Sequence, residues 1–433
     1  MVRVIAKDGT VLQPTNRHGK VRRLLRDGKA KVISKEPFTI QLLYKTKSKK
    51  TQPIRVYFDT GSKYQGFALV SNNKVISKGT IELRDGISEL ISQRRRYRRS
   101  RRHRNKRYRS PHSDNCQYGK GWLPPSIESK YQHITHWINK ITSCLPDYHL
   151  IVEIAKFDIQ AMDTPGIEGE DYQHGNLYGY ENTKQYVIHR EKSRCQLCGN
   201  PKGDDKWNLH HRKAKKDGGS DRAKNLALLH GSCHTKFHNE DLSDGDLTSL
   251  EGKSQRFKDA TFMNIIKNRL QRELKAYYDK QVHFTYGFIT NINRRMLGLE
   301  KTHYNDALAM HGLPVINKVK PLYIKQVRKK KRSLHEAIPR AGRGDKVNHE
   351  QVRRAKNSKS ITKKGKLWSL WDKVYIPKLK TTGFISGFTG KWVYLQDIDG
   401  KYLKLPGKSY KQMNPDQLKL VGRNNNWICK IAG

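Results

Sequence analysis

Cysteine and histidine residues are concentrated near the middle of the chain at spacings that suit metal ligation. Cys195 and Cys198 form one pair, and His230 and Cys233 form a second pair with the same spacing. Two such pairs can hold a tetrahedral Zn²⁺, which compensates for a small hydrophobic core. We therefore expect these four residues to bind a structural Zn²⁺; the alternative is a set of reduced cysteines without metal.

A second group of polar residues lies between and just after these pairs. His210 and His211 are adjacent, Asn225 follows, and His234 and His238 come after the last cysteine. Paired histidines at a strand end allow His211 to act as general base on a water while His210 helps to hold a divalent ion on a phosphate. His234 or His238 would complete the metal set, and Asn225 would orient the loop or the base. Each histidine taken alone is equally consistent with an ordinary surface or core residue.

Carboxylates that are far apart in the sequence form a third group. Asp59 ends an apolar run, Glu153 interrupts another, and His303 and Asp306 lie three residues apart on an expected helix. Cleavage of a phosphodiester with two Mg²⁺ ions roughly 3.5–4 Å apart needs oxygen ligands that converge from different elements, which these acids can supply. Individually, Asp59 is also consistent with a turn residue, Glu153 with a strand edge and Asp306 with a helix-face charge.

The charge of the chain indicates a polyanionic partner. The 433 residues include 87 Lys and Arg against 39 acidic residues, a formal net charge of +48, which disfavours a compact state unless it is neutralised. Residues 94–109 hold ten Arg in sixteen positions, spread around every face of any helix, so this segment cannot bury a side against protein. We expect the Arg residues to contact nucleic-acid phosphates, although a solvated basic tail is the alternative. They are Arg94, Arg95, Arg96, Arg98, Arg99, Arg101, Arg102, Arg104, Arg107 and Arg109.

Other features favour a cytoplasmic protein that does not contact a membrane. No apolar run approaches the roughly 18 residues of a spanning helix, and the N-terminus lacks the apolar core of a signal peptide. Cys116, Cys144 and Cys429 are scattered, so the six cysteines do not suggest a disulfide framework.

The elements that must position these residues can be read from periodicity. Residues 54–83 predict three antiparallel strands, and residues 126–143 predict a helix that is followed by a buried strand at 148–155. A helix is expected near 258–277 and a strand at 282–289. The Cys- and His-rich unit at 184–240 therefore looks like an insertion into a host domain.

These motifs resemble two nuclease families. The order CxxC, HH, NL and CHxxxH at 195–238 resembles the HNH (ββα-metal) nucleases, and FDTGS, VEIAKFD and HYNDA resemble the three separated motifs of RuvC-type, RNase H-like nucleases. A split RuvC with an HNH insertion behind an Arg-rich segment is similar to IscB, the transposon-encoded relatives of type II CRISPR nucleases. GWLPPSI at 121–127 adds to this likeness, whereas Leu12-Gln13-Pro14-Thr15 departs from the Pro-Leu-Met-Pro motif usual in the first domain.

The resemblance implies an α+β multidomain fold. An RNase H-like (RuvC) core would be split by the Arg-rich bridge helix and by the ββα-metal HNH insertion, with a small N-terminal cap and a small C-terminal β-barrel. The implied boundaries are: cap 1–53, RuvC part I 54–83, bridge helix 84–112, RuvC part II 113–165, linker 166–183, HNH 184–243, RuvC part III 244–317, basic linker 318–366 and C-terminal domain 367–433.

The resemblance also implies an activity and its partners. A guide RNA, the omega RNA, would pair with one strand of a double-stranded DNA target, so that base pairing reads the sequence. The HNH site, with one Mg²⁺ on His210, His234 and His238, would cut the paired strand. The RuvC site, with two Mg²⁺ on Asp59, Glu153 and Asp306, would cut the displaced strand. The protein would be a monomer in a cytoplasmic, prokaryotic ribonucleoprotein that joins the nucleoid when bound to DNA.

The C-terminal domain resembles one that reads a short motif beside the target. It carries aromatic and basic residues such as Trp368, Trp371, Lys378, Lys380 and Lys391. Two other activities fit the same residues: a guide-independent nuclease acting on structured or specific DNA, and a catalytically silent RNA-binding or transposon-regulating protein.

Overall fold

The computed structural model describes residues 1–35, 37–46, 48–84, 86–102, 117–119, 121–143, 145–163, 177, 179–201, 205–240, 242–248, 257–327, 360–407 and 409–431. Arg104, Arg107 and Arg109, much of the expected linkers and part of the expected bridge helix lie outside these ranges. The chain divides into two compact units, one of Met1–Ala155 with Ile266–Gly433 and one of Lys156–Ile265.

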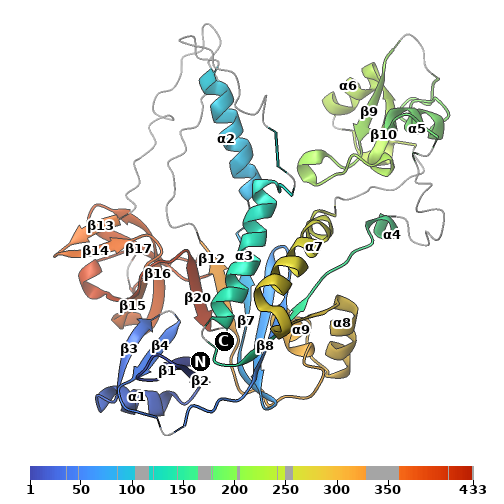
Figure 1. Cartoon of the computed structure of the whole chain (residues 1–433). Helices are drawn as coiled ribbons and strands as arrows, with labels where there is room; N and C mark the ends of the chain where they lie inside the picture. The colour runs from blue at the N-terminus through green and yellow to red at the C-terminus, as the bar shows by residue number, and fades with distance from the viewer. Residues whose placement is uncertain are drawn as a thin grey trace. The chain divides into compact units, whose positions relative to one another are not determined.

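The first unit is built on a seven-stranded mixed sheet (Figure 1). Its strands, in spatial order, are β11 (Val282–Thr285), β8 (Tyr148–Glu153), β5 (Ile54–Asp59), β6 (Tyr64–Ser71), β7 (Lys74–Glu82), β12 (Leu322–Gln326) and β20 (Trp427–Ile431). β5, β6 and β7 form the predicted antiparallel meander, whereas β8 runs parallel to β5 and β11 runs parallel to β8. The parallel arrangement brings the ends of β5 and β8 to one edge of the sheet.

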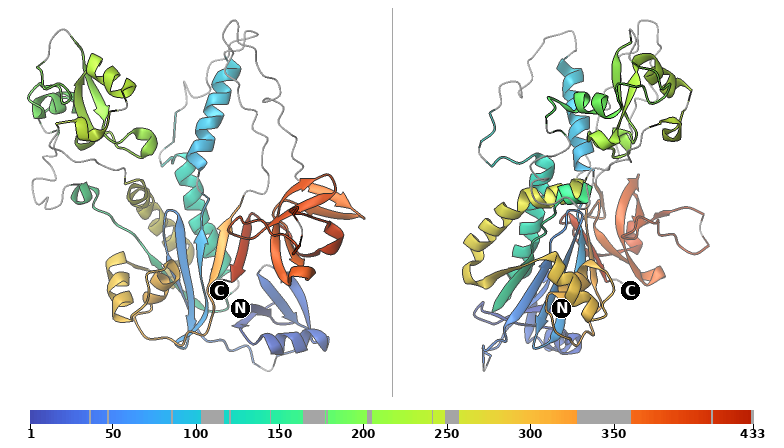
Figure 2. Two further views of the ribbon diagram at one scale, coloured as in Figure 1. Left: turned by 180° about the vertical axis from the view of Figure 1, so that it is seen from behind. Right: turned by 90° about the vertical axis from the view of Figure 1, so that its right-hand side faces the viewer.

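Helices cover both faces of this sheet, which explains why its strands are apolar on both sides (Figure 2). Phe67 and Leu69 of β6 face α3 (Pro125–Thr142), while Ala68 and Val70 pack with the helix α9 (His303–Ala309) on the opposite face. α3 confirms the predicted helix at 126–143. α7 (Lys258–Tyr278) confirms the one predicted near 258–277.

Two smaller sheets belong to the same unit. The N-terminal sheet has the order β2 (Val11–Thr15), β1 (Val2–Ile5), β4 (Phe38–Leu42) and β3 (Ala30–Lys35), and it packs on α1 (His18–Arg26). The C-terminal sheet has the order β18 (Gln412–Met413), β17 (Trp392–Gln396), β16 (Thr381–Thr389), β15 (Lys373–Ile376) and β19 (Lys419–Gly422), and the hairpin β13 (Ser360–Lys363) and β14 (Lys366–Ser369) precedes it.

The C-terminal region differs from the expectation in three respects. β12 lies inside the predicted basic linker, yet it pairs with β7 as part of the central sheet. β20 lies inside the predicted C-terminal domain, yet it pairs with β12. Trp368, one of the aromatic residues of the expected motif-reading domain, is 4% exposed and lies in the core of the C-terminal sheet, where it packs with Val374, Ile385 and their neighbours.

The strand predicted at 282–289 is also wrong in its second half. β11 ends at Thr285, and α8 (Gly287–Met296) begins two residues later. The Arg-rich segment forms α2 (Ile87–Arg102) as far as it is described. Over the described residues, no helix is both long enough and apolar enough to span a membrane.

The second unit is a small ββα arrangement. β9 (Trp207–His211) and β10 (Leu226–His230) pair antiparallel, and α6 (Gly231–Asn239) packs on them together with α5 (Thr183–Arg190); α4 (Ile159–Asp163) also belongs to this unit. Its core contains Val187, Trp207, Leu228, Leu229 and Phe237.

Candidate active sites

Three histidines of the second unit form a candidate metal site. His210 is 7% exposed near the end of β9, and His234 and His238 lie four residues apart on α6, so that they share one face of the helix. One ring nitrogen from each of the three lies within 4.8 Å of the other two. Burial, and then the charge of His238, lower the pKa of His234, which keeps its imidazole neutral and able to ligate. The structure thus brings together the predicted metal set.

His211, the predicted general base, lies outside this set and contacts a carboxylate. Successive side chains of a strand point in opposite directions, so His211 does not point the same way as His210. Its Nε2 lies 2.8 Å from Oδ1 of Asp221, and Nζ of Lys215 lies 2.6 Å from the same oxygen. Hydrogen bonds from Lys215 and His211 lower the pKa of Asp221 to about 2, so it is a carboxylate at neutral pH.

Asn225 positions the loop between β9 and β10. The side chain is fully buried and donates to the carbonyls of Lys213 (3.0 Å) and Ser220 (2.9 Å), while its Oδ1 accepts from the Lys213 amide at 3.0 Å. Of the two roles considered for Asn225, the contacts favour orienting the loop. The loop also needs Gly219, because a Cβ there would lie 1.8 Å from the Lys213 carbonyl oxygen.

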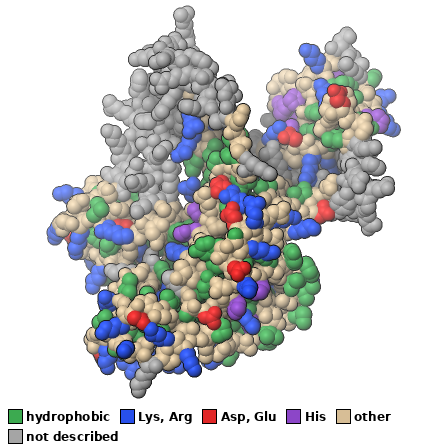
Figure 3. Space-filling model, viewed as in Figure 1, with side chains coloured by type: hydrophobic (Ala, Val, Ile, Leu, Met, Phe, Trp, Pro, Cys, Tyr) green, Lys and Arg blue, Asp and Glu red, His purple; other side chains and the backbone are tan. Residues whose placement is uncertain are grey.

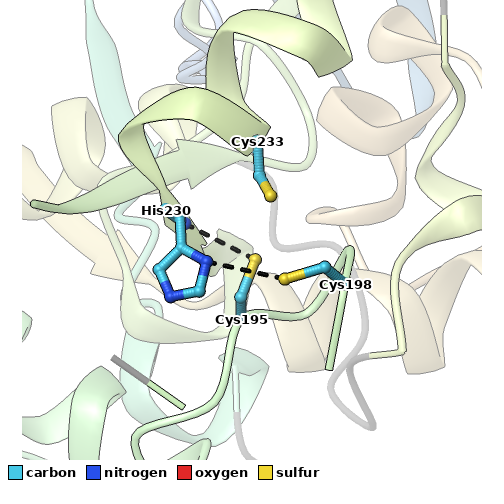
Figure 4. Close-up of side chains that lie close together, drawn as sticks. All are labelled: Cys195, Cys198, His230 and Cys233. Atoms are coloured by element: carbon cyan, nitrogen blue, oxygen red, sulfur yellow. Dashed lines mark hydrogen bonds between the residues drawn. The ribbon is translucent and has the colours of Figure 1, made fainter. Parts of the chain in front are cut away.

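The four residues of the two spaced pairs also converge. Cys195, Cys198, His230 and Cys233 point toward one another, and their ligand atoms lie within 4.8 Å of each other (Figure 4). The backbone N–H of His230 donates to Sγ of Cys195 at 3.5 Å, and its Nδ1 lies 3.5 Å from Sγ of Cys198. Burial and the neighbouring thiols raise the pKa of Cys233 to about 12. Three thiols and an imidazole form a donor set typical of structural Zn²⁺, so these residues fit such an ion.

The carboxylates of the first unit meet at the edge of the central sheet. Asp59 ends β5 and is 8% exposed, and its Oδ2 lies 3.2 Å from Nδ1 of His303. Asp59, His303 and Asp306 each offer a ligand atom within 4.8 Å of the others. α9 can approach this closely because Gly66 of β6 has no side chain: a Cβ there would lie 1.8 Å from the His303 carbonyl oxygen. Asp59 raises the pKa of His303, and burial followed by the Asp59 charge raises that of Asp306.

Glu153 lies beside this group without belonging to the set of mutual near contacts. It ends β8, and the hydroxyl of Thr60 donates to its backbone carbonyl at 2.6 Å. Burial, and then the charges of Asp59 and Asp306, raise the pKa of the Glu153 carboxyl to about 7. Its Oε2 is buried without a hydrogen-bond partner. An orphaned carboxylate oxygen next to two further acids fits a bound divalent cation. Asp59, Glu153, His303 and Asp306 are called the carboxylate site below.

Residues from α8 complete the carboxylate site and were not predicted. Thr290 is 3% exposed and hydrogen-bonds Glu153, while Nε of Arg294 lies 2.9 Å from Oδ1 of Asp306. A Cβ on Gly287 would lie 3.1 Å from Oε1 of Glu153. The sequence offered one signal, the spacing of 287, 290 and 294 on one helical face, which the expected strand concealed.

Of the predicted phosphate-contacting residues, Arg94, Arg95 and Arg98 of α2 are exposed. The side chains of Arg96, Arg99, Arg101 and Arg102 lie outside the described part of the chain.

Comparisons with known proteins relate two parts of the chain to known families. Residues 195–240 match the HNH endonuclease family, and residues 2–175 match the RRXRR protein family. No curated protein matches the chain. Similar solved structures include Streptococcus thermophilus Cas9 in complex with the AGAA PAM (14% identity, TM-score 0.34, covering 48% of this chain and 29% of that one). The same protein with the GGAA PAM gives 12% identity and a TM-score of 0.41, covering 71% and 55%. The Type II-C Cas9 from Actinomyces naeslundii gives 10% identity and a TM-score of 0.25, covering 61% and 60%.

The chain therefore spans less than two thirds of each of these structures. The HNH match covers the thiol pairs, the paired histidines and α6. The chain has a mixed α/β, multidomain fold and carries an HNH endonuclease domain at residues 195–240.

Proposed function

We propose that the chain is an RNA-guided DNA endonuclease of the IscB type with two active sites. The HNH site cuts the guide-paired strand and the carboxylate site cuts the displaced strand, next to a short target-adjacent motif. The observation that carries the proposal is that each unit holds one candidate catalytic metal site, the three histidines in the second unit and the carboxylate site in the first, in addition to the thiol cluster of the second unit. Two such sites allow each strand to be cut by its own set of residues.

The residues of the HNH site support hydrolysis of a phosphodiester. A divalent cation such as Mg²⁺ on His210, His234 and His238 would supply charge stabilisation at the scissile phosphate. Nε2 of His211 is held by Asp221. The other nitrogen, Nδ1, is then the one that takes a proton from the attacking water. The Asp221 carboxylate stabilises the imidazolium that forms.

The sheet and its acids support an RNase H-like reading of the first unit. A meander β5–β6–β7, flanked on the β5 side by the parallel strands β8 and β11, delivers Asp59 and Glu153 side by side. α9 adds His303 and Asp306 from another part of the chain. Mg²⁺ ions bound there would neutralise the charges of these acids. Without such ions, burial and the charges of Asp59 and Asp306 leave Glu153 partly protonated near pH 7.

The charge of the molecule supports a nucleic-acid guide. The net charge of +48 and the exposed Arg94, Arg95 and Arg98 fit phosphate contacts, which are independent of sequence. Sequence selection then falls to base pairing with the omega RNA. In the C-terminal region, the exposed Lys378, Lys380 and Lys391 remain candidates for contact with DNA beside the target.

Strand-specific cutting tests the proposal. The purified chain is mixed with Mg²⁺, the RNA that co-purifies with it and a plasmid library that contains a matching target, and the ends of both strands are sequenced. Asp59→Ala and His211→Ala should each leave one strand cut, on opposite strands, whereas Asp147→Ala and His189→Ala, outside both sites, should cut both. Cutting that persists after the RNA is removed would instead establish a guide-independent nuclease.

A further inference from the structure

The outward face of α8 carries exposed aromatic and aliphatic side chains. Phe288, Ile292 and Met296 recur at four-residue spacing and are 66%, 52% and 80% exposed. Tyr286, which precedes the helix, is 45% exposed, and its ring lies nearly parallel to that of Phe288, with 12° between the planes and 6.4 Å between the centroids. Hydrophobic side chains gather over α8 on the visible face (Figure 3). A surface helix ordinarily turns such a stripe toward the core.

The opposite face of α8 forms a wall of the carboxylate site. Gly287, between the two aromatic residues, lies against Glu153, and Thr290 and Arg294 reach Glu153 and Asp306. Gly287 therefore connects the two aromatic residues directly, and it is also the residue that lies against the carboxylate site. Tyr286 and Phe288 therefore flank the residue that lies against Glu153.

The surrounding charges favour a nucleic-acid occupant. Arg295 on α8 and Lys301 before α9 are exposed, and Lys301 lies close enough to the site to influence the pKa of His303 and Asp306. Aromatic faces next to cations are the combination on which unpaired bases stack, irrespective of their sequence. A folded protein partner would use Ile292 and Met296 as readily as the aromatic pair, which provides a way to distinguish the two.

We propose that Tyr286 and Phe288 form a stacking platform for unpaired bases of the DNA strand that enters the carboxylate site, and that this platform holds the nucleotide beside the scissile phosphate. The inference rests on the proposed function, because it requires that a displaced single strand be cut there. It adds a substrate-positioning surface to that site. Base stacking changes binding by about ten-fold or more per base, which sets the size of the expected effect.

The test compares variants of Phe288 in the RNA-loaded chain, with the two target strands labelled separately. Phe288→Ala and Phe288→Leu should slow cutting of the displaced strand about ten-fold and leave the paired strand unchanged, while Phe288→Trp should retain the wild-type rate. Met296→Ala is the matched control on the same helix. Since both positions are largely exposed, these changes should not affect folding.

A second measurement reports stacking without cutting. In Asp59→Ala protein, a 2-aminopurine placed beside the scissile phosphate of the displaced strand should be quenched, and Phe288→Ala added to this protein should relieve the quenching. Equal rates for Phe288→Ala and wild type, a full rate for Phe288→Leu, or slowing by Met296→Ala would overturn the platform while leaving the two-site function intact. Displaced-strand cutting that survives Asp59→Ala would instead overturn the proposed function, and the platform with it.

Discussion

The contact between His211 and Asp221 gives the HNH site a feature beyond its metal ligands. An acid that holds one imidazole nitrogen fixes which tautomer is present and stabilises the charged form that arises when the other nitrogen takes a proton. Asp221 is exposed, and its hydrogen bonds keep it ionised at neutral pH. In the proposed mechanism Asp221 acts through His211, as a positioning residue.

Asp221→Asn should lower the rate of HNH-dependent cutting about 10- to 100-fold, as loss of a partner behind the reacting residue commonly does. The charge is lost while the shape is kept, so KM and the fold should be nearly unchanged. Asp217→Asn, in the same loop, is the control. A rate within two-fold of wild type would show that the contact has no catalytic role.

Most residues that carry chemistry could be predicted because their types are unusual in their local surroundings. Glu153 stood out as the charged residue of an apolar strand, and its partners were recognisable because such acids must be paired or ligate a cation. Asp221, Thr290 and Arg294 were missed because nothing in their immediate sequence is exceptional. Their roles arise from contacts with residues that are distant in the sequence or across a loop.

At the scale of elements, periodicity identified the meander and the helices α3 and α7, but it failed at α8 and β20. Residues 282–290 are rich in Thr, Tyr, Phe and Ile, which favour a strand, yet the chain turns into a helix at Gly287. Packing of Thr290 and Arg294 against the acids outweighs that preference. β20 has the alternating pattern of any strand, and its partner strand β12 lies about 100 residues earlier in the sequence. The local pattern therefore could not show to which sheet β20 belongs.

α3 carries a half-buried histidine, His133, whose titration should affect the stability of the helix. His133 lies beside Trp427 of β20, and Nε2 accepts from Nε2 of Gln326 at 2.6 Å. Burial, followed by the charges of His136 and Arg84, lowers the pKa of His133 to about 4. The folded state thus keeps the ring neutral, whereas the unfolded state takes up a proton below about pH 6.5. Stability is full above that pH and falls as the pH drops from about 6.5 toward 4.

When the pH falls from 7 to 5, protonation of His133 in the unfolded state should lower the free energy of unfolding of this region by about 1 kcal/mol. This figure allows for the partial exposure of His133 to solvent. Hydrogen exchange of α3 amides, corrected for intrinsic rates at each pH, measures the loss. His133→Gln should reduce the pH dependence, while exposed His18→Gln should leave it as in wild type. An identical pH dependence in wild type and His133→Gln would contradict the assignment.

At the scale of the whole molecule, the two units differ in how their folds are stabilised. The first unit buries a seven-stranded sheet between helices, which is enough apolar burial to be stable by itself. The second unit has a smaller core around β9, β10 and α6, and next to it lie three thiols and an imidazole. A cluster of thiols without a cation is a poor stabiliser, because thiols form only weak hydrogen bonds with one another.

Removal of metal should therefore loosen one unit and spare the other. In the full chain, treatment with a strong chelator should release about one zinc per molecule and lower the stability of β9, β10 and α6 by about 3 kcal/mol or more, because binding of structural zinc is coupled to folding. The amide hydrogens of β9, β10 and α6 should exchange faster, while those of β5–β8 keep their protection. Cys198→Ser should reproduce the effect, and Cys429→Ser, in the first unit, should not. If the purified protein holds no zinc, or if the chelator leaves the second unit equally protected, the four residues are reduced side chains in a fold that the apolar core alone stabilises.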